Sequence, residues 1–210
     1  MSHLLTAPSI PAPIARHRPP KPTWEIALLF PGQGDWSEEE YLLLPTNRLV
    51  ELSDRRLEVL PMPSTLHQRI LLFLIRELLA FAEPRKLGEA LMAALPVRLW
   101  AGKFREPDVV FMLAKHRSRI QAEYWEGADL VMEVVSPHDS QRDLLRKRRE
   151  YAQAGIPEYW IVDPQHGKIA VLRLQGKKYV VHGEYARGEQ AESALLPGFR
   201  VEVAKVFAGK

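Results

Sequence analysis

The strongest constraint on this chain is an apolar stretch, Ala128 to Val135 (ADLVMEVV), that carries an acid, Glu133, in its interior. Its length, its valines and the Ser136-Pro137 step after it predict a β-strand. Alternation divides the side chains between two faces, Leu130, Met132 and Val134 on one and Val131, Glu133 and Val135 on the other. Apolar residues on both faces predict a strand that is covered on both sides. A carboxylate there is costly unless a cation, a metal ion or hydrogen-bond donors meet it, so the partner of Glu133 is the first question.

The composition indicates one globular domain behind an N-terminal tail. Residues 1–22 hold six of the 17 prolines and, through Arg16, Arg18 and Lys21, the whole formal excess of +3 charges. We predict a disordered, basic, proline-rich tail over residues 1–22 and a single charge-balanced domain over residues 23–210. The lack of cysteine excludes disulfides, thiolate zinc sites and a cysteine nucleophile, and it fits a cytoplasmic protein. The longest apolar segment, Leu66 to Phe81, is interrupted by charged residues, so no membrane span is expected.

The periodicity of the sequence predicts strands that alternate with two substantial helices, which indicates a mixed α/β fold around one sheet. Helices are expected over Ser37 to about Leu44, with a Ser37–Glu40 capping box, over Ser64–Ala82, and over Ser140–Ala154 before Gly155. Further strands are expected over Thr23–Phe30, Leu49–Leu52, Arg56–Leu60, Glu89–Leu95, Val97–Trp100, Asp108–Met112, Pro157–Val162, Ile169–Leu174 and Lys178–His182. The polar segment Ala114 to Gly127 is expected to be a loop with one helical turn.

Three acids adjoin the expected strands: Glu51, Asp108 and Glu133. Neighbouring strands of one sheet could bring Asp108 and Glu133 within a few ångströms of each other. Carboxylates that close repel each other unless a cation neutralises them, and Mg²⁺ prefers such oxygen ligands together with water and phosphate. An ion pair with an arginine is the more ordinary role of a strand acid, and for Glu51 both alternatives stay open.

Lys147 is the cation that could complete such a site. The helix around it is crowded with arginines, most of which are expected to form a solvated basic face. At about 100° per residue, Leu144, Tyr151 and Ala154 form an apolar sector, and Lys147 falls within it. An inward ammonium beside two carboxylates can neutralise charge, orient a water or stabilise a developing phosphorane. Asp143, four residues earlier, could instead pair with Lys147 on the helix surface.

Several motifs in order resemble one family. They are Val50-Glu51-Leu52, Met62-Pro63-Ser64 with His67, Arg105-Glu106-Pro107-Asp108, Glu133-Val134-Val135-Ser136-Pro137, Arg142-Asp143 with Lys147 and Tyr151, and the block from Gly155 to Pro164 (GIPEYWIVDP). Together they are similar to the Uma2 family, also called DUF820, of the PD-(D/E)XK nuclease superfamily. The resemblance implies a restriction-endonuclease-like fold, in which a mixed central sheet is flanked by helices.

The resemblance also implies roles for residues. Asp108 and Glu133 would be metal ligands, the carbonyl of Val134 would complete the shell, and Glu51 would bind the metal or orient its water. The superfamily has a lysine where this chain has Val135, and Lys147 on the following helix matches the displaced catalytic lysine. Two further residues, His67 and Tyr151, would support the ligands or contact phosphate, although a histidine at a helix start is more often an exposed or capping residue.

These expectations favour an endonuclease that uses Mg²⁺, or Mn²⁺ in its place, to hydrolyse DNA, and a homodimer would suit double-strand cutting. The balanced charge of residues 23–210 favours a different class, a catalytically inactive nuclease-like fold that serves as a nucleic-acid-binding or assembly module. Arg142, Arg146, Arg148 and Arg149 could still line a groove for nucleic acid. A phosphohydrolase acting on nucleotides is a third reading.

Overall fold

The computed structural model describes residues 30–46, 48–136 and 141–208 of the chain, and for residues 141–143 it describes the backbone alone. The expected tail, residues 1–22, and all but the last residue of the expected strand Thr23–Phe30 lie outside these ranges. The chain divides into two units, Met1–Gly32 and Gln33–Lys210, and every described helix and strand belongs to the second.

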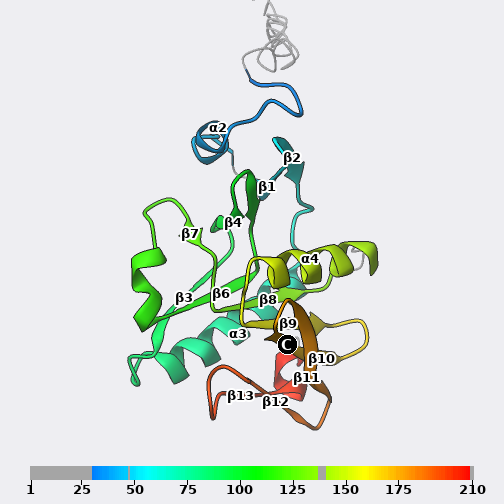
Figure 1. Ribbon diagram of the computed structural model, residues 1–210. Coiled ribbons are helices and arrows are strands. Elements are labelled where there is room, and N and C mark those ends of the chain that lie inside the picture. Colours follow the sequence, from blue (N-terminus) through cyan, green and yellow to red (C-terminus); the bar gives the residue numbers. More distant parts are fainter. Residues whose placement is uncertain (1–29, 47, 137–140, 209–210) are drawn as a thin grey trace, which may run out of the picture. The chain divides into compact units, whose positions relative to one another are not determined.

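Strands and helices alternate along this unit, which confirms the mixed α/β class (Figure 1). The helices are α2 (Glu38–Leu42), α3 (Thr65–Ala82), α4 (Gln141–Gln153) and α5 (Val203–Val206), with a 3₁₀ helix η1 (Ala114–Arg119). The strands are β1 (Val50–Ser53), β2 (Arg56–Val59), β3 (Gly88–Met92), β4 (Val97–Trp100), β5 (Lys103–Arg105), β6 (Val109–Leu113), β7 (Trp125–Glu126), β8 (Leu130–Val134), β9 (Glu158–Asp163), β10 (Lys168–Gln175), β11 (Lys178–Ala186), β12 (Gln190–Glu192) and β13 (Arg200–Glu202).

The described strands form two larger sheets and a small one, where the sequence predicted a single sheet. One has the order β11-β10-β9-β8-β6-β3, another β2-β1-β5-β4-β7, and β12 pairs with β13. In the first sheet β8 and β9 run parallel across the α4 connection, while the other neighbours are antiparallel. Strands β3 and β4 follow each other in the chain but belong to different sheets, because β3 pairs with β6 and β4 pairs with the unpredicted strand β5.

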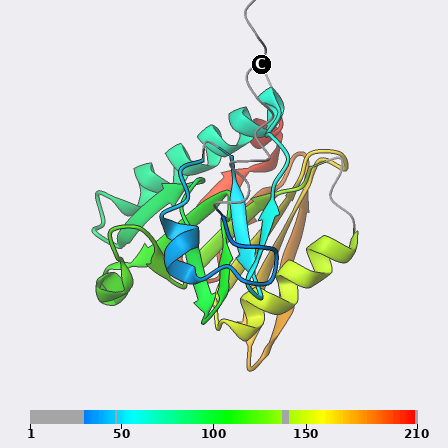
Figure 2. The same cartoon turned by 90° about the horizontal axis from the view of Figure 1, so that it is seen from above.

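Strand β8 is covered on both faces, as its apolar pattern predicted. Figure 2 shows α3 and α4 on opposite sides of the sheet. One core cluster joins Leu130, Met132 and Val134 to the buried side of α3. A second cluster joins Val131 to Tyr151 and other residues of α4 and β9. Glu133, which alternates with the first set, therefore faces the α4 side.

Local sequence signals fix where the helices begin and end. The hydroxyl of Ser64 accepts a hydrogen bond from the backbone N–H of His67 and caps α3. The capping box predicted for Ser37 and Glu40 is present at α2. Gly155 has φ +76° just after α4, a left-handed conformation in which glycine avoids the strain of a side chain. Within the described residues, no helix is long and apolar enough to cross a membrane.

Candidate active site

Strand register brings Asp108 and Glu133 together. Strands β6 and β8 pair Val109 with Met132 and Val110 with Val131. One further step of this register places Asp108 opposite Glu133, and directly opposed residues share a face with Cβ atoms about 5 Å apart. The pairing ends there, and the N–H of Val134 donates to Oδ2 of Asp108 at 2.7 Å. The carboxylate thus substitutes for a strand partner at the end of the ladder.

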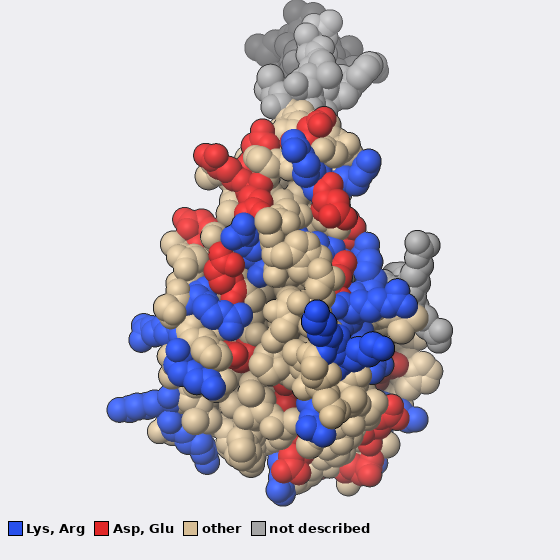
Figure 3. Space-filling view, in the orientation of Figure 1, with Lys and Arg blue, Asp and Glu red and all other residues tan. Residues whose placement is uncertain are grey.

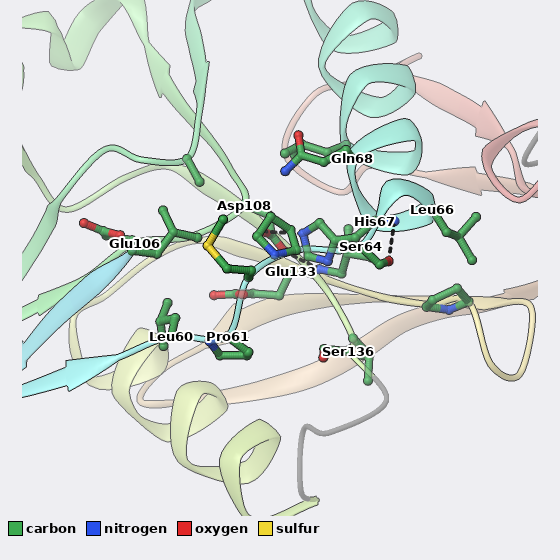
Figure 4. A pocket seen from close by; sticks show the side chains of 18 of the residues that line it. Leu60, Pro61, Ser64, Leu66, His67, Gln68, Glu106, Asp108, Glu133 and Ser136 are labelled. Carbon is green, nitrogen blue, oxygen red and sulfur yellow. Dashed lines mark hydrogen bonds and ion pairs between the residues drawn. The ribbon is translucent and has the colours of Figure 1, made fainter. Parts of the chain in front are cut away.

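His67 contacts Asp108 from α3, the helix on the side of the sheet opposite α4 (Figure 2). The ring Nε2 lies 2.8 Å from Oδ1 of Asp108, and the ring belongs to the first turn of α3 (Figure 4). The Ser64 cap fixes the backbone of His67, so the histidine belongs to a helix start and also contacts the candidate ligand. The side chain of His67 is only 15% exposed and the cap of α3 is Ser64, so His67 is neither an exposed nor a capping residue. A supporting role toward a ligand or a phosphate stays a prediction.

Glu133 is held by two side chains of α4. Its Oε2 lies 2.9 Å from Nζ of Lys147, and its Oε1 accepts a short hydrogen bond from the hydroxyl of Tyr151. Lys147 is 9% exposed, which confirms the inward orientation predicted from the helix geometry. The helix thereby supplies an ammonium at the acid, although Val135 occupies the strand position expected for a lysine.

Burial dominates the protonation of this cluster. It raises the pKa of Glu133 to about 7, with the Lys147 ammonium opposing the rise and the Asp108 carboxylate adding to it. Burial would lower the pKa of Lys147, but the charges of Glu133 and Glu51 and the hydrogen bond to Glu133 together raise the pKa above its ordinary value. Burial also raises the pKa of Tyr151 well above the ordinary value, so the hydroxyl stays protonated and donates. The site therefore holds a retained cation beside carboxylates that are costly to ionise together.

These groups open into a cavity of about 600 Å³. Asp108, Glu133, Lys147, His67 and Val134 all line it. Figure 4 shows His67 meeting Asp108 in the middle of this pocket, with Glu133 beside them. The structure thus gathers most of the sequence-predicted site residues around one space that is large enough for a ligand.

Glu51 lies apart from that space. Its side chain is completely buried in β1, is ion-paired with Arg105, and accepts a hydrogen bond from the N–H of Glu106 at 3.1 Å. It is not among the described residues that line the cavity. The unpredicted strand β5 causes this arrangement, because its pairing with β1 brings Arg105 alongside. Glu51 therefore has the arginine partner that the sequence left open, and its role as a metal ligand stays a prediction.

Glu106 lines the cavity but was not singled out from the sequence. Its Oε2 accepts a hydrogen bond from the N–H of Val50 at 3.2 Å. Burial, and next the charge of Glu51, raise the pKa of Glu106 to about 7. The available signal was its position two residues before Asp108, which is the spacing of residues that share a strand face.

The donor set suits a hard cation that keeps much of its water. Within the described residues, no group of three or more Asp, Glu, His and Cys side chains is arranged to hold a metal ion. The two opposed carboxylates belong to Asp108 and Glu133, and among the described residues each of their four oxygens accepts one hydrogen bond or ion pair. A carboxylate oxygen has two lone pairs, so these contacts leave a second lone pair on each oxygen for a further ligand. Mg²⁺ is bound in this manner, by one or two carboxylates with water and phosphate.

Comparison with known proteins identifies the fold and the family of this chain. A solved structure from Anabaena variabilis, titled a putative nuclease belonging to DUF820, superposes with a TM-score of 0.67 at 18% identity, covering 81% of this chain and 97% of that one. This likeness shows a shared fold. No curated protein is similar enough to count as a match. The model of the Uma2 family, described as "Putative restriction endonuclease", matches residues 38–204. The chain belongs to the Uma2 family.

Proposed function

We propose that this protein is an endonuclease that hydrolyses phosphodiester bonds in DNA with Mg²⁺, for which Mn²⁺ can substitute. Membership in the Uma2 family supports nuclease activity in general. The observation that carries the finer proposal is the opposed acid pair, Asp108 and Glu133, with Lys147 at the same cavity.

The residues divide the chemistry between them. Asp108 and Glu133 would hold the ion, with the carbonyl of Val134 and water completing its shell. The chemistry that a divalent ion would supply there is Lewis acidity, which would make a water more acidic and polarise the scissile phosphate. Lys147 presents its ammonium to the negative charge that develops on the phosphate. Tyr151 and His67 hold the two carboxylates in place by their hydrogen bonds.

The charge of the cavity supports a cation requirement. Three acids line it, Glu106, Asp108 and Glu133, and Lys147 is the one lysine or arginine among its described lining residues. An approaching phosphodiester carries negative charge and would be repelled by ionised acids at this range. The two carboxylates Asp108 and Glu133 would be neutralised by a divalent ion, so phosphate and metal are expected to bind together.

A second hollow supports a nucleic-acid substrate. It lies between α4 and the β10–β11 turn, measures about 290 Å³, and is lined by Arg148, Arg149, Lys177 and Lys178 with no acid among its described lining residues. Figure 3 shows lysine and arginine side chains gathered over the α4 region. Arg146, by contrast, makes an ion pair with Glu58. Four cations around one hollow suit phosphates that flank the scissile bond.

The test is cleavage by the purified full chain. Plasmid, linear duplex and single-stranded DNA are incubated with Mg²⁺, Mn²⁺ or EDTA, with mononucleotides assayed alongside. We expect ion-dependent cutting of DNA that falls on the order of 1000-fold in Glu133→Gln. Glu89→Gln is the matched control, because Glu89 is an exposed acid in β3 of the same sheet. Equal cutting by wild type and Glu133→Gln would reject the proposed site, and turnover of mononucleotides alone would indicate the nucleotide phosphohydrolase.

One observation favours the binding or assembly module instead. Each oxygen of the acid pair already has a partner within the protein, so the cluster is satisfied without an ion. DNA binding that is indifferent to metal and to Glu133→Gln, together with absent cleavage, would support that alternative. Sedimentation of the same preparations tests the homodimer that double-strand cutting would favour.

A further inference from the structure

One side of the active-site cavity is apolar. The segment from β2 to the first turn of α3 contributes Leu60, Pro61, Met62, Pro63 and Leu66, which we call the apolar wall. Met62 is 65% exposed and Leu66 43% exposed, although both border the cavity. Large apolar side chains that stay exposed next to a functional site often mark a surface that a ligand covers.

A phosphodiester backbone does not explain this wall. Its phosphates are charged and are bound by cations, backbone N–H groups and metal ions. The faces of bases in a duplex are already covered by their stacked neighbours. The part of a nucleic acid that offers free apolar surface next to a phosphate is an unstacked base, and proteins receive such bases between aromatic or apolar side chains.

The size and layout of the cavity fit such an occupant. A volume of about 600 Å³ exceeds what one phosphate needs and lies in the range of pockets that enclose small organic ligands. Figure 4 shows the acid pair between Leu60 and Pro61 on one side and Gln68 on the other. Gln68 and Gln165 also line the cavity, and their amides offer both donors and acceptors for the edge of a base.

We propose that the apolar wall receives an unpaired nucleobase adjoining the scissile phosphate, so that the substrate of this site is single-stranded or locally unpaired DNA. This inference rests on the proposed nuclease function and narrows its substrate. The phosphate lies at the acid pair and Lys147, while its base packs on Met62 and Leu66. A paired base must first leave its stack, which we expect to slow duplex cutting on the order of 100-fold.

The first arm of the test varies the substrate. Three oligonucleotides share one sequence: a single strand, a perfect duplex, and a duplex with a one-nucleotide bulge. Each carries 2-aminopurine, whose fluorescence rises when it unstacks. We expect the single strand and the bulge to be cut about 100-fold faster than the perfect duplex, with cuts beside the bulge. Equal rates on all three would overturn the inference while leaving the nuclease function intact.

The second arm varies the wall. The double variant Met62→Ser, Leu66→Ser removes apolar surface at exposed positions. Leu72→Ser is the control, because Leu72 belongs to α3 as Leu66 does and is 51% exposed, but it does not line the cavity. We expect the double variant to bind single-stranded DNA about 10-fold more weakly, with a smaller rise in 2-aminopurine fluorescence. The loss should vanish for an oligonucleotide with abasic sites throughout, which has no base to offer.

The two arms separate the possible failures. A loss of affinity in the wall variant that persists on abasic DNA would overturn the inference, because the contact would then be with the backbone. A protein that cleaves no substrate would reject the nuclease function. If its wall variant still lost affinity only for DNA that has bases, the base-binding role of the apolar wall would stand. Affinity equal to wild type in the double variant would reject the wall itself.

Discussion

Two buried acids on neighbouring strands have opposite surroundings. Glu133 of β8 and Glu158 of β9 belong to a parallel pair, in which Glu158 is opposite Leu130 and Glu133 is opposite Ile161. Burial raises the pKa of both. Glu158 is held by neutral donors, the indole of Trp160, the hydroxyl of Ser193 and the N–H of Leu195, at 2.6–2.7 Å. Glu133 instead meets an ammonium, a tyrosine hydroxyl and a second acid at a cavity.

The difference shows that a buried strand acid does not by itself indicate a functional site. Glu158 ties β9 to the segment before β13, and its oxygens are satisfied by groups that no ligand needs to displace. Glu133 combines charge neutralisation with access to an open cavity. What distinguishes a candidate active site is thus the second carboxylate, the cation and the space beside them.

The largest effect is expected from exchanging each acid for its amide. Glu133→Gln should lower the cleavage rate on the order of 1000-fold, because the amide is a poor ligand for a divalent ion. Glu158→Gln should leave the rate per folded molecule within about twofold, since Glu158 does not line the cavity. Initial rates on one DNA substrate measure both. A comparable loss in the two variants would erase the proposed distinction.

A smaller effect is expected from removing the cation of the site. Lys147→Met should lower the cleavage rate on the order of 100-fold, because the ammonium no longer stabilises charge on the phosphate. Arg149→Met removes the same charge from the exposed side of α4 and serves as control. We expect it to weaken DNA binding most at low salt, with a shallower dependence of affinity on salt, while the maximal rate is kept. If Lys147→Met changed only the affinity, Lys147 would be a binding residue.

Removal of Glu158 should affect stability more than activity. Glu158→Ala leaves the three donors of its cluster without their acceptor, and we expect unfolding to become easier by about 3 kcal/mol. Urea denaturation with an unchanged m-value measures this loss. Glu158→Gln keeps an acceptor oxygen and should lose less. An unchanged midpoint for the alanine variant would show that water replaces the carboxylate at no cost.

The smallest effect is a pH dependence of stability that Glu158 should contribute. Burial raises its folded pKa above the ordinary value of 4.5, so the folded state binds its proton more tightly than the unfolded state does. The resulting stabilisation is fully present below about pH 4.5 and is lost as the pH rises through the folded pKa. The unfolding free energy of the wild type should therefore fall relative to that of Glu158→Gln as the pH rises from about 4.5 through the folded pKa. A difference that is constant with pH would show that Glu158 keeps its ordinary pKa.

Strong local patterns made much of the fold predictable. The apolar periodicity of α3 and the alternation in β8 gave their extents and buried faces because both patterns follow directly from backbone geometry. The same reasoning placed Asp108 beside Glu133 and turned Lys147 inward. These inferences needed only neighbouring strands and one helix whose apolar sector faces the sheet.

The unpredicted parts depend on partners far away in the chain. The sequence of strand β5 is Lys-Phe-Arg, which has no apolar pattern. Its two charged residues are nevertheless buried, because Lys103 and Arg105 both form ion pairs with Glu150 of α4. Without β5, the sequence could not show that the strands divide into two larger sheets or that Glu51 meets Arg105. The short range of strand alternation carries no information about such long-range ion pairs.

The placement of Lys147 on a helix has a mechanical consequence. The acids belong to the sheet, whereas the ammonium and the Tyr151 hydroxyl belong to α4 and contact Glu133 from successive turns. Sliding the helix along the sheet by one turn, about 5.4 Å, would break both contacts at once. The site therefore depends on the alignment of α4 with the sheet. A displaced α4 would inactivate the site although every site residue was still present.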